Sequence, residues 1–169
     1  MRVEDIVNDI TAYTILDNSD LNIEFLSNIY NILVVYNSPI TLYAKVRNRD
    51  VIFVKNDTTE NMWKAFCHEF AHFHLHFGNQ TKTKNLFNFK QEAEAEKFSL
   101  LLRMPERLIV TNELWTAEQL VYYFKVTYLE AYKRLEMLIN RSKTHPLVGI
   151  KSIWRNFGGI KICGMKKGF

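Results

Sequence analysis

The chain has 169 residues, of which 47% are hydrophobic and 24% charged, and its formal net charge is +4. This composition excludes an intrinsically disordered chain, and the length favours a single domain. Two cysteines exclude a disulfide framework, and no apolar stretch approaches the roughly 20 residues that span a membrane. Because acidic residues follow closely on Met1, we expect no signal peptide and a cytoplasmic protein that stays off the membrane.

The first third of the chain predicts two short helices and three short strands. Apolar residues at helical spacing indicate a helix from Val3 to Ile10, and Asp20 is placed to cap a second helix. Runs of β-branched and apolar residues then predict strands at 32–36, 40–46 and 51–54. Because short turns join these strands, we expect a small antiparallel three-stranded sheet.

Longer helical patterns follow the sheet. Asp57 stands three residues before Glu60, as in a capping box, and the helix that begins there is expected to end near Gly78. A polar loop is predicted at 79–88, and a helix at 91–104 that Pro105 terminates.

The last third is predicted to be helical and then irregular. Thr116 is placed to cap one further helix that extends through Leu135. We therefore expect an α+β fold in which residues 1–110 form the main domain and 111–140 add a helical C-terminal part. Residues 141–169 are predicted to form a basic irregular tail.

The pentapeptide His68-Glu69-Phe70-Ala71-His72 has the pattern His-Glu-x-x-His. On a helix, His68 and His72 lie one turn apart on one face, where two imidazoles can bind one Zn²⁺ ion. Glu69 lies beside them and can take a proton from a metal-bound water as the general base. The pattern therefore predicts a zinc hydrolase with His68 and His72 as metal ligands and Glu69 as the catalytic residue.

A third ligand is expected from the acidic helix that follows. Glu92 and Glu96 lie one turn apart on one face, and the methyl group of Ala95 between them allows a close approach to the histidine helix. We therefore favour Glu92 as the third ligand, which leaves one coordination position open for water. Glu96 would then accept a hydrogen bond from the far nitrogen of a ligating histidine. Glu94 is the alternative third ligand.

Three further residues near the motif are expected to lie outside the metal site. His74 cannot share a metal with His68 on one helix, and His76 lies two turns from His68, so both are expected at the surface or in contact with the ligands. Cys67 is expected to pack as a small apolar residue.

At these residues the chain resembles the ImmA/IrrE metallopeptidases, which are intracellular zinc enzymes of bacteria, mobile elements and phages. The family pattern joins a strand and a His-Glu-x-x-His helix to an acidic helix, Glu-x-Glu-Ala-x-x-Phe-Ala, that runs into Leu-Leu-x-Pro. The resemblance covers roughly residues 30–138, with matching segments at 51–55, 68–76, 92–99 and 100–105. The chain departs from the pattern at Glu96, where Asn or Asp is usual, and at Ser99, where Ala is common.

The resemblance implies a zincin-like metallopeptidase fold, with the small sheet packed on the His-Glu-x-x-His helix, and a gluzincin-like Zn²⁺ site of two histidines and one glutamate. It also implies an endopeptidase whose protein substrate is a helix-turn-helix repressor, so that cleavage relieves repression in a phage or mobile element. Strand 51–55 is a candidate edge for pairing with an extended substrate.

The alternative function is a non-proteolytic regulator with the same fold that binds a repressor or DNA. Between Lys133 and Phe169 there are nine Lys or Arg residues against one acid, Glu136. Such a segment can contact nucleic acid, although a solvated basic end explains the same composition and is the favoured interpretation.

Overall fold

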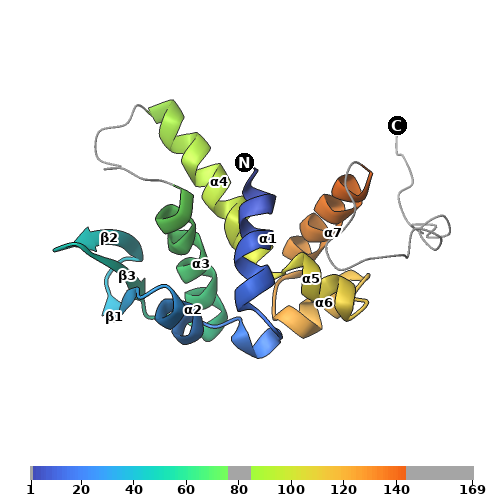
Figure 1. The fold of residues 1–169 in the computed structure, drawn as a ribbon, viewed down its shortest axis with the longest axis horizontal. Helices are drawn as coiled ribbons and strands as arrows, with labels where there is room; N and C mark the ends of the chain where they lie inside the picture. The colour runs from blue at the N-terminus through green and yellow to red at the C-terminus, as the bar shows by residue number, and fades with distance from the viewer. Residues whose placement is uncertain (1, 76–84, 144–169) are drawn as a thin grey trace.

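The computed structural model describes residues 2–75 and 85–143 and confirms the predicted α+β fold (Figure 1). A three-stranded sheet and seven α-helices account for most of the described residues. In chain order the elements are α1 (Val3–Thr14), the 3-10 helix η1 (Asn18–Asp20), α2 (Ile23–Ile29), β1 (Leu33–Ser38), β2 (Leu42–Val46), β3 (Arg49–Lys55), α3 (Thr59–Leu75), α4 (Asn85–Arg103), α5 (Glu106–Thr111), α6 (Ala117–Phe124) and α7 (Tyr128–Ser142).

The sheet lies at one end of the molecule, and α5, α6 and α7 lie at the other (Figure 1). Helix α3 packs against β2 and β3 on one side and against α4 on the other. Helix α1 crosses the middle of the molecule, where it contacts α4 and α5. The pair α3–α4 is therefore the centre of the fold, and it carries the residues singled out in the sequence.

The sheet is mixed, so the prediction of an antiparallel sheet was wrong. The strand order is β1-β3-β2, with β1 parallel and β2 antiparallel to β3. Only β2 and β3 form a hairpin, through the turn residues Arg47 and Asn48, which both have positive φ. The four consecutive apolar residues from Val51 to Val54 suit a central strand with a neighbour on each side. The antiparallel prediction relied instead on the short connections, which are typical of strands that pair in sequence order.

Helices α2 and α3 begin close to the predicted positions but use different caps. The side chain of Asn22, not Asp20, accepts the hydrogen bond that caps α2. Thr58, not Asp57, accepts from the backbone N–H of Asn61 at the start of α3, while Asp57 accepts from the backbone N–H of Thr58. Helix α4 already begins at Asn85, inside the segment predicted as a loop, and the predicted end of α3 near Gly78 lies outside the described residues.

The single helix predicted from Thr116 through Leu135 is two helices, α6 and α7. Lys125 has φ 55, a left-handed conformation that ends α6. Thr127 then caps α7, and Glu130 bonds back to the Thr127 backbone N–H to complete a capping box. The chain breaks there because this Thr-x-x-Glu start competes with continuation of α6. Helix α7 continues to Ser142, two residues into the predicted tail, whose residues from 144 on lie outside the described part.

The core between α3 and α4 is aromatic. Phe66 and Phe70 on α3 and Phe98 on α4 are fully buried, and the ring centroids of Phe70 and Phe98 are 6.2 Å apart. Ala95 is also fully buried, as expected for the residue at the closest approach of the two helices. Cys67 packs in this core as predicted, and burial raises the pKa of its thiol. None of the described helices has the length and apolar character to span a membrane.

An ion cluster that is buried at Arg103 and half-exposed at Lys64 joins α3, α4 and α7. One carboxylate oxygen of Glu130 accepts from Arg103 Nη2 at 2.7 Å and lies 2.9 Å from Lys64 Nζ. The other oxygen accepts from the backbone N–H and the hydroxyl of Thr127, at 3.0 and 2.9 Å. Both oxygens of one carboxylate are therefore satisfied, and the two helices that carry the candidate site are anchored to α7.

Candidate metal centre

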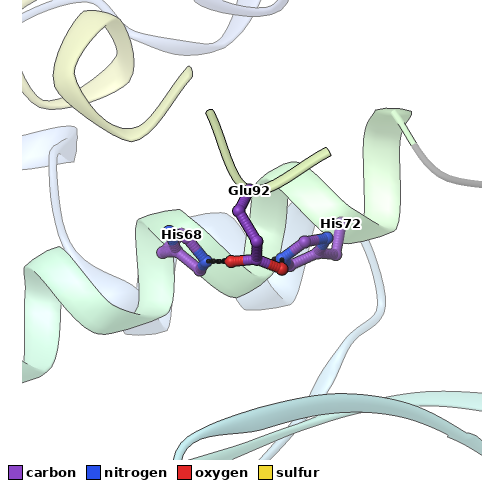
Figure 2. A group of neighbouring side chains, drawn as sticks. All are labelled: His68, His72 and Glu92. Atoms are coloured by element: carbon purple, nitrogen blue, oxygen red, sulfur yellow. Dashed lines mark hydrogen bonds and ion pairs between the residues drawn. The ribbon is translucent and has the colours of Figure 1, made fainter. Parts of the chain in front are cut away.

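The structure brings His68, His72 and Glu92 together (Figure 2). The two histidines project from one face of α3, and Glu92 reaches them from α4. His68 Nε2 lies 3.3 Å from His72 Nε2 and 3.1 Å from Glu92 Oε2, and His72 Nε2 lies 3.5 Å from Glu92 Oε1. The His72 side chain is 4% exposed and that of Glu92 is 57% exposed, so the cluster is buried at His72 and open to solvent at Glu92.

The chemistry and spacing of these donors fit a tetrahedral Zn²⁺ ion. Zinc binds imidazole nitrogen and carboxylate oxygen at about 2.0–2.2 Å, so two such donors on one tetrahedral ion lie about 3.3–3.6 Å apart. The distances between the donor atoms, 3.1 to 3.5 Å, are close to this tetrahedral edge. Three protein donors leave the fourth corner for water, as in catalytic rather than structural zinc sites.

Glu69 follows His68 on α3 and is tied to the sheet. Its Oε2 accepts a 2.7 Å hydrogen bond from the backbone N–H of Tyr43 on β2. Burial raises the pKa of the Glu69 carboxyl above its usual value, although the Tyr43 hydrogen bond and the nearby His68 oppose the rise. The carboxylate is thus held beside the cluster without being part of it, as a proton acceptor must be.

Tyr43 is the part of the site that sequence reasoning missed. Its hydroxyl donates to Asp50 at 2.7 Å and its ring packs edge-on against Phe73, so side-chain contacts to β3 and α3 hold the β2 backbone beside Glu69. The predicted substrate edge, strand 51–55, was wrong because β3 is flanked by β1 and β2. The exposed edge beside the cluster belongs to β2. Recognising the hairpin through Arg47 and Asn48 would have placed β2 next to β3. It would not have shown that β1 lies on the other side of β3.

The other acidic residues of α4 take different positions. Glu96 Oε2 lies 3.8 Å from His68 Nδ1, on the side of the ring away from the cluster, where the predicted hydrogen-bond acceptor belongs. Glu94 faces Lys90 on its own helix, with 3.8 Å between Oε1 and Nζ. Among the described residues, only His68, His72 and Glu92 form a group able to hold a metal. The geometry therefore favours Glu92 over Glu94.

His74 is enclosed by aromatic rings rather than placed at the surface or against the ligands. Its ring lies 4.5 to 4.9 Å, between centroids, from those of Phe70, Phe73 and Tyr30. Burial lowers the pKa of this imidazole to about 4, so it is neutral near neutral pH. Its role in the described structure is packing behind the ligand-bearing face. His76 lies outside the described residues.

Exchanging single acids on α4 tests the ligand assignment. Glu92→Gln is expected to lower zinc affinity by more than the 10- to 100-fold that loss of an outer hydrogen-bond partner typically costs, because it removes a ligand. Glu94→Gln is the matched control and should bind zinc as the parent does. Competition titration against a zinc-binding dye measures both affinities. A greater loss in the Glu94 variant would make Glu94 the ligand.

The sequence of this chain is similar to that of a known protein family. A peptidase family model, M78, described as the IrrE N-terminal-like domain, matches residues 30–136. The match runs from the end of α2 into α7 and contains all of the cluster residues. No curated protein and no solved structure matches the chain. Since the family model covers more than half of the 169 residues, the chain belongs to the ImmA/IrrE family of metallopeptidase-type proteins.

Proposed function

We propose that this protein is a cytoplasmic zinc-dependent endopeptidase that cleaves a helix-turn-helix repressor and so relieves repression in a phage or mobile element. The observation that carries the catalytic part of the proposal is the cluster of His68, His72 and Glu92, whose donor atoms all lie within 4.8 Å of one another. Membership of a peptidase family supports peptide hydrolysis, and the family resemblance supports the choice of a repressor as substrate.

Two histidines and one carboxylate would hold the ion. Bound zinc lowers the pKa of water toward about 7 and polarises a peptide carbonyl. Glu69 accepts the proton of the attacking water and later delivers it to the amine nitrogen of the leaving fragment. The Tyr43 N–H fixes the Glu69 carboxylate while it does so. Glu96, whose Oε2 lies 3.8 Å from His68 Nδ1, would orient the His68 ring if it moved into hydrogen-bond distance.

An extended substrate would pair with the outer edge of β2. This strand lies at the edge of the sheet, and the Tyr43 N–H on that edge already reaches Glu69. A peptide that adds to β2 as a further strand therefore brings its backbone beside the proton acceptor. Main-chain pairing of this kind recognises an extended segment of a protein and places little demand on its sequence.

The proposal is tested by metal-dependent cleavage of a candidate repressor, for which a helix-turn-helix protein encoded beside this chain is the first choice. We expect intact-mass analysis to show two fragments whose masses sum to the substrate plus one water. A chelator should abolish the fragments, and stoichiometric Zn²⁺ should restore them. Cleavage that continues in chelator, or an intact repressor after incubation with zinc-loaded protein, would contradict the proposal.

A second candidate function is binding of a repressor or DNA without cleavage. It is favoured by α6 and α7, which form two helices joined by a three-residue turn and expose Tyr122, Tyr128 and Tyr132. Lys125 in the turn lies 4.6 Å from the centre of the Tyr122 ring. A gel-shift assay across salt concentrations discriminates the two functions, because contacts to phosphates weaken steeply as salt rises. Salt-sensitive DNA binding together with an uncut repressor would favour this alternative.

A further inference from the structure

The two faces of the sheet differ in what covers them. Residues that pair directly across strands share a face. Val34, Tyr43 and Ile52 lie on the inner face, where they pack against the core that contains α3. The outer face is formed by Val51 and Phe53 on β3, Leu33 and Val35 on β1, and Leu42 and Val46 on β2. Val51, at the centre of this face, is only 4% exposed, whereas the other five residues neither belong to the core nor pack against it.

The outer face is apolar although it lacks a covering layer among the described residues. Leu33 is 51% exposed, Val46 44% and Leu42 38%. A sheet with one solvated face normally alternates apolar and polar residues, whereas a sheet covered on both sides has apolar residues on both. Between Arg49 and Lys55, β3 has the second pattern. The sheet is therefore built for a second layer opposite α3.

The charges at the ends of the outer face are all positive. Arg49 pairs with Val46, and Lys55 follows Phe53 by two residues, so both cations lie on this face at opposite ends of β3. Both residues are exposed, and Lys55 lies close enough to Asp57 to help lower the pKa of that carboxyl. Asp57 is the first acid after Lys55 in the sequence. Its carboxylate accepts hydrogen bonds from the backbone N–H of Thr58 and from the side-chain amide of Asn61. A partner surface with carboxylates would complement the two cations.

We propose that the outer face binds an acidic amphipathic helix of a partner protein. The apolar stripe of the helix would cover Phe53 and the exposed Leu33 and Leu42, and its carboxylates would pair with Arg49 and Lys55. Six residue steps along β3 span about 20 Å, which corresponds to about 13 residues of α-helix, or between three and four turns. The site goes beyond the proposed peptidase function, since it lies on the sheet and includes none of the cluster residues.

Charge also distinguishes this partner from a second copy of the chain. Two outer faces packed together would bring the cations of both copies into one interface, and like charges in contact cost several kcal/mol. A helix is favoured over another class of partner because the inner face of the same sheet is already covered by a helix, α3, and layers of this kind are typical of α+β domains.

Fluorescence anisotropy with the full-length protein tests the proposal. The probe is a labelled synthetic helical peptide of about four turns, with a Leu/Ala stripe and glutamates at both ends, and the matched probe has lysines in their place. We expect the acidic peptide to bind at least about tenfold more tightly than the basic one. Arg49→Gln with Lys55→Gln should remove this preference, while the charge-preserving exchange of Arg49→Lys with Lys55→Arg should retain it.

Changes in the apolar centre give an independent readout. Leu33→Thr with Leu42→Thr keeps residues that favour β-strands. It should weaken binding of the acidic peptide by about tenfold, because the complex then loses the apolar surface of two partly buried leucine side chains. Tyr13→Gln with Leu16→Gln alters two residues that are still more exposed and lie near the end of α1, outside the sheet, and should leave binding unchanged.

Three results would overturn the proposal. The first is equal binding of the two peptides, or binding of neither. The second is a dimer of the parent protein in sedimentation that Leu33→Thr with Leu42→Thr converts to a monomer, which would assign the face to a second copy. The third is binding of the parent, lost in the same double variant, to vesicles of phosphatidylcholine and phosphatidylserine, which would assign the face to an anionic membrane.

Discussion

Glu69→Gln is expected to eliminate peptide cleavage while zinc binding and the fold persist. Glutamine retains the shape of the side chain, and its amide oxygen can still accept the hydrogen bond from the Tyr43 N–H that now ends on Glu69 Oε2. It cannot take a proton from water, so the variant loses general-base catalysis, which typically contributes 10²–10⁴-fold to the rate. The initial rate of repressor cleavage, measured on samples of known zinc content, checks the expectation.

The same helix offers a matched control. Glu60 is an exposed glutamate in the first turn of α3, two turns before His68, and Glu60→Gln removes the same charge from the same element. We expect this variant to retain the parental rate. Cleavage by the Glu69 variant at the parental rate would show that Glu69 is not the base. Loss of zinc together with activity would instead place Glu69 in the metal site itself.

The candidate cluster could be predicted from the sequence because each relationship in it is local to a helix. The spacing of His68 and His72 places them on one face whatever surrounds α3, and the spacing of Glu92 and Glu96 does the same on α4. Ala95, between the two glutamates, marked the side of α4 that approaches α3, and it is fully buried there. Helical periodicity thus selected Glu92 over Glu94 before the two helices were placed.

Relationships between segments far apart in the chain were harder to predict. The position of β1 beside β3 depends on a connection that crosses the sheet, which the short turn after Ser38 does not reveal. Sequence reasoning therefore placed the substrate on β3 and missed the hydrogen bond from Tyr43 to Glu69, which joins residues 26 positions apart. The break between α6 and α7 was missed because the apolar period continues through it, although Thr127 and Glu130 form a capping box there.

Glu130→Gln is expected to lower the free energy of unfolding by about 3–5 kcal/mol, the usual cost of breaking a buried ion pair by removal of one partner. The substitution leaves Arg103, which is 4% exposed, without its anion. Lys64 is 44% exposed at its side chain and regains water, so the loss arises chiefly at Arg103. Denaturant unfolding followed by circular dichroism measures the change. Glu136→Gln, at an exposed position of α7, is the control and should differ little from the parent.

The same cluster predicts how stability depends on pH. Burial alone would raise the pKa of Glu130, but hydrogen bonds from Arg103, Lys64 and the Thr127 backbone outweigh it, and the pKa is held far below its usual value. Because the folded pKa lies below the unfolded one, the contribution of Glu130 is complete above the unfolded pKa of about 4.3 and is lost as pH falls toward the folded value. The difference in unfolding free energy between the parent and Glu130→Gln should therefore shrink as pH falls below about 4.3. A difference that stays constant through this range would mean that Glu130 stabilises the protein by packing, not by charge.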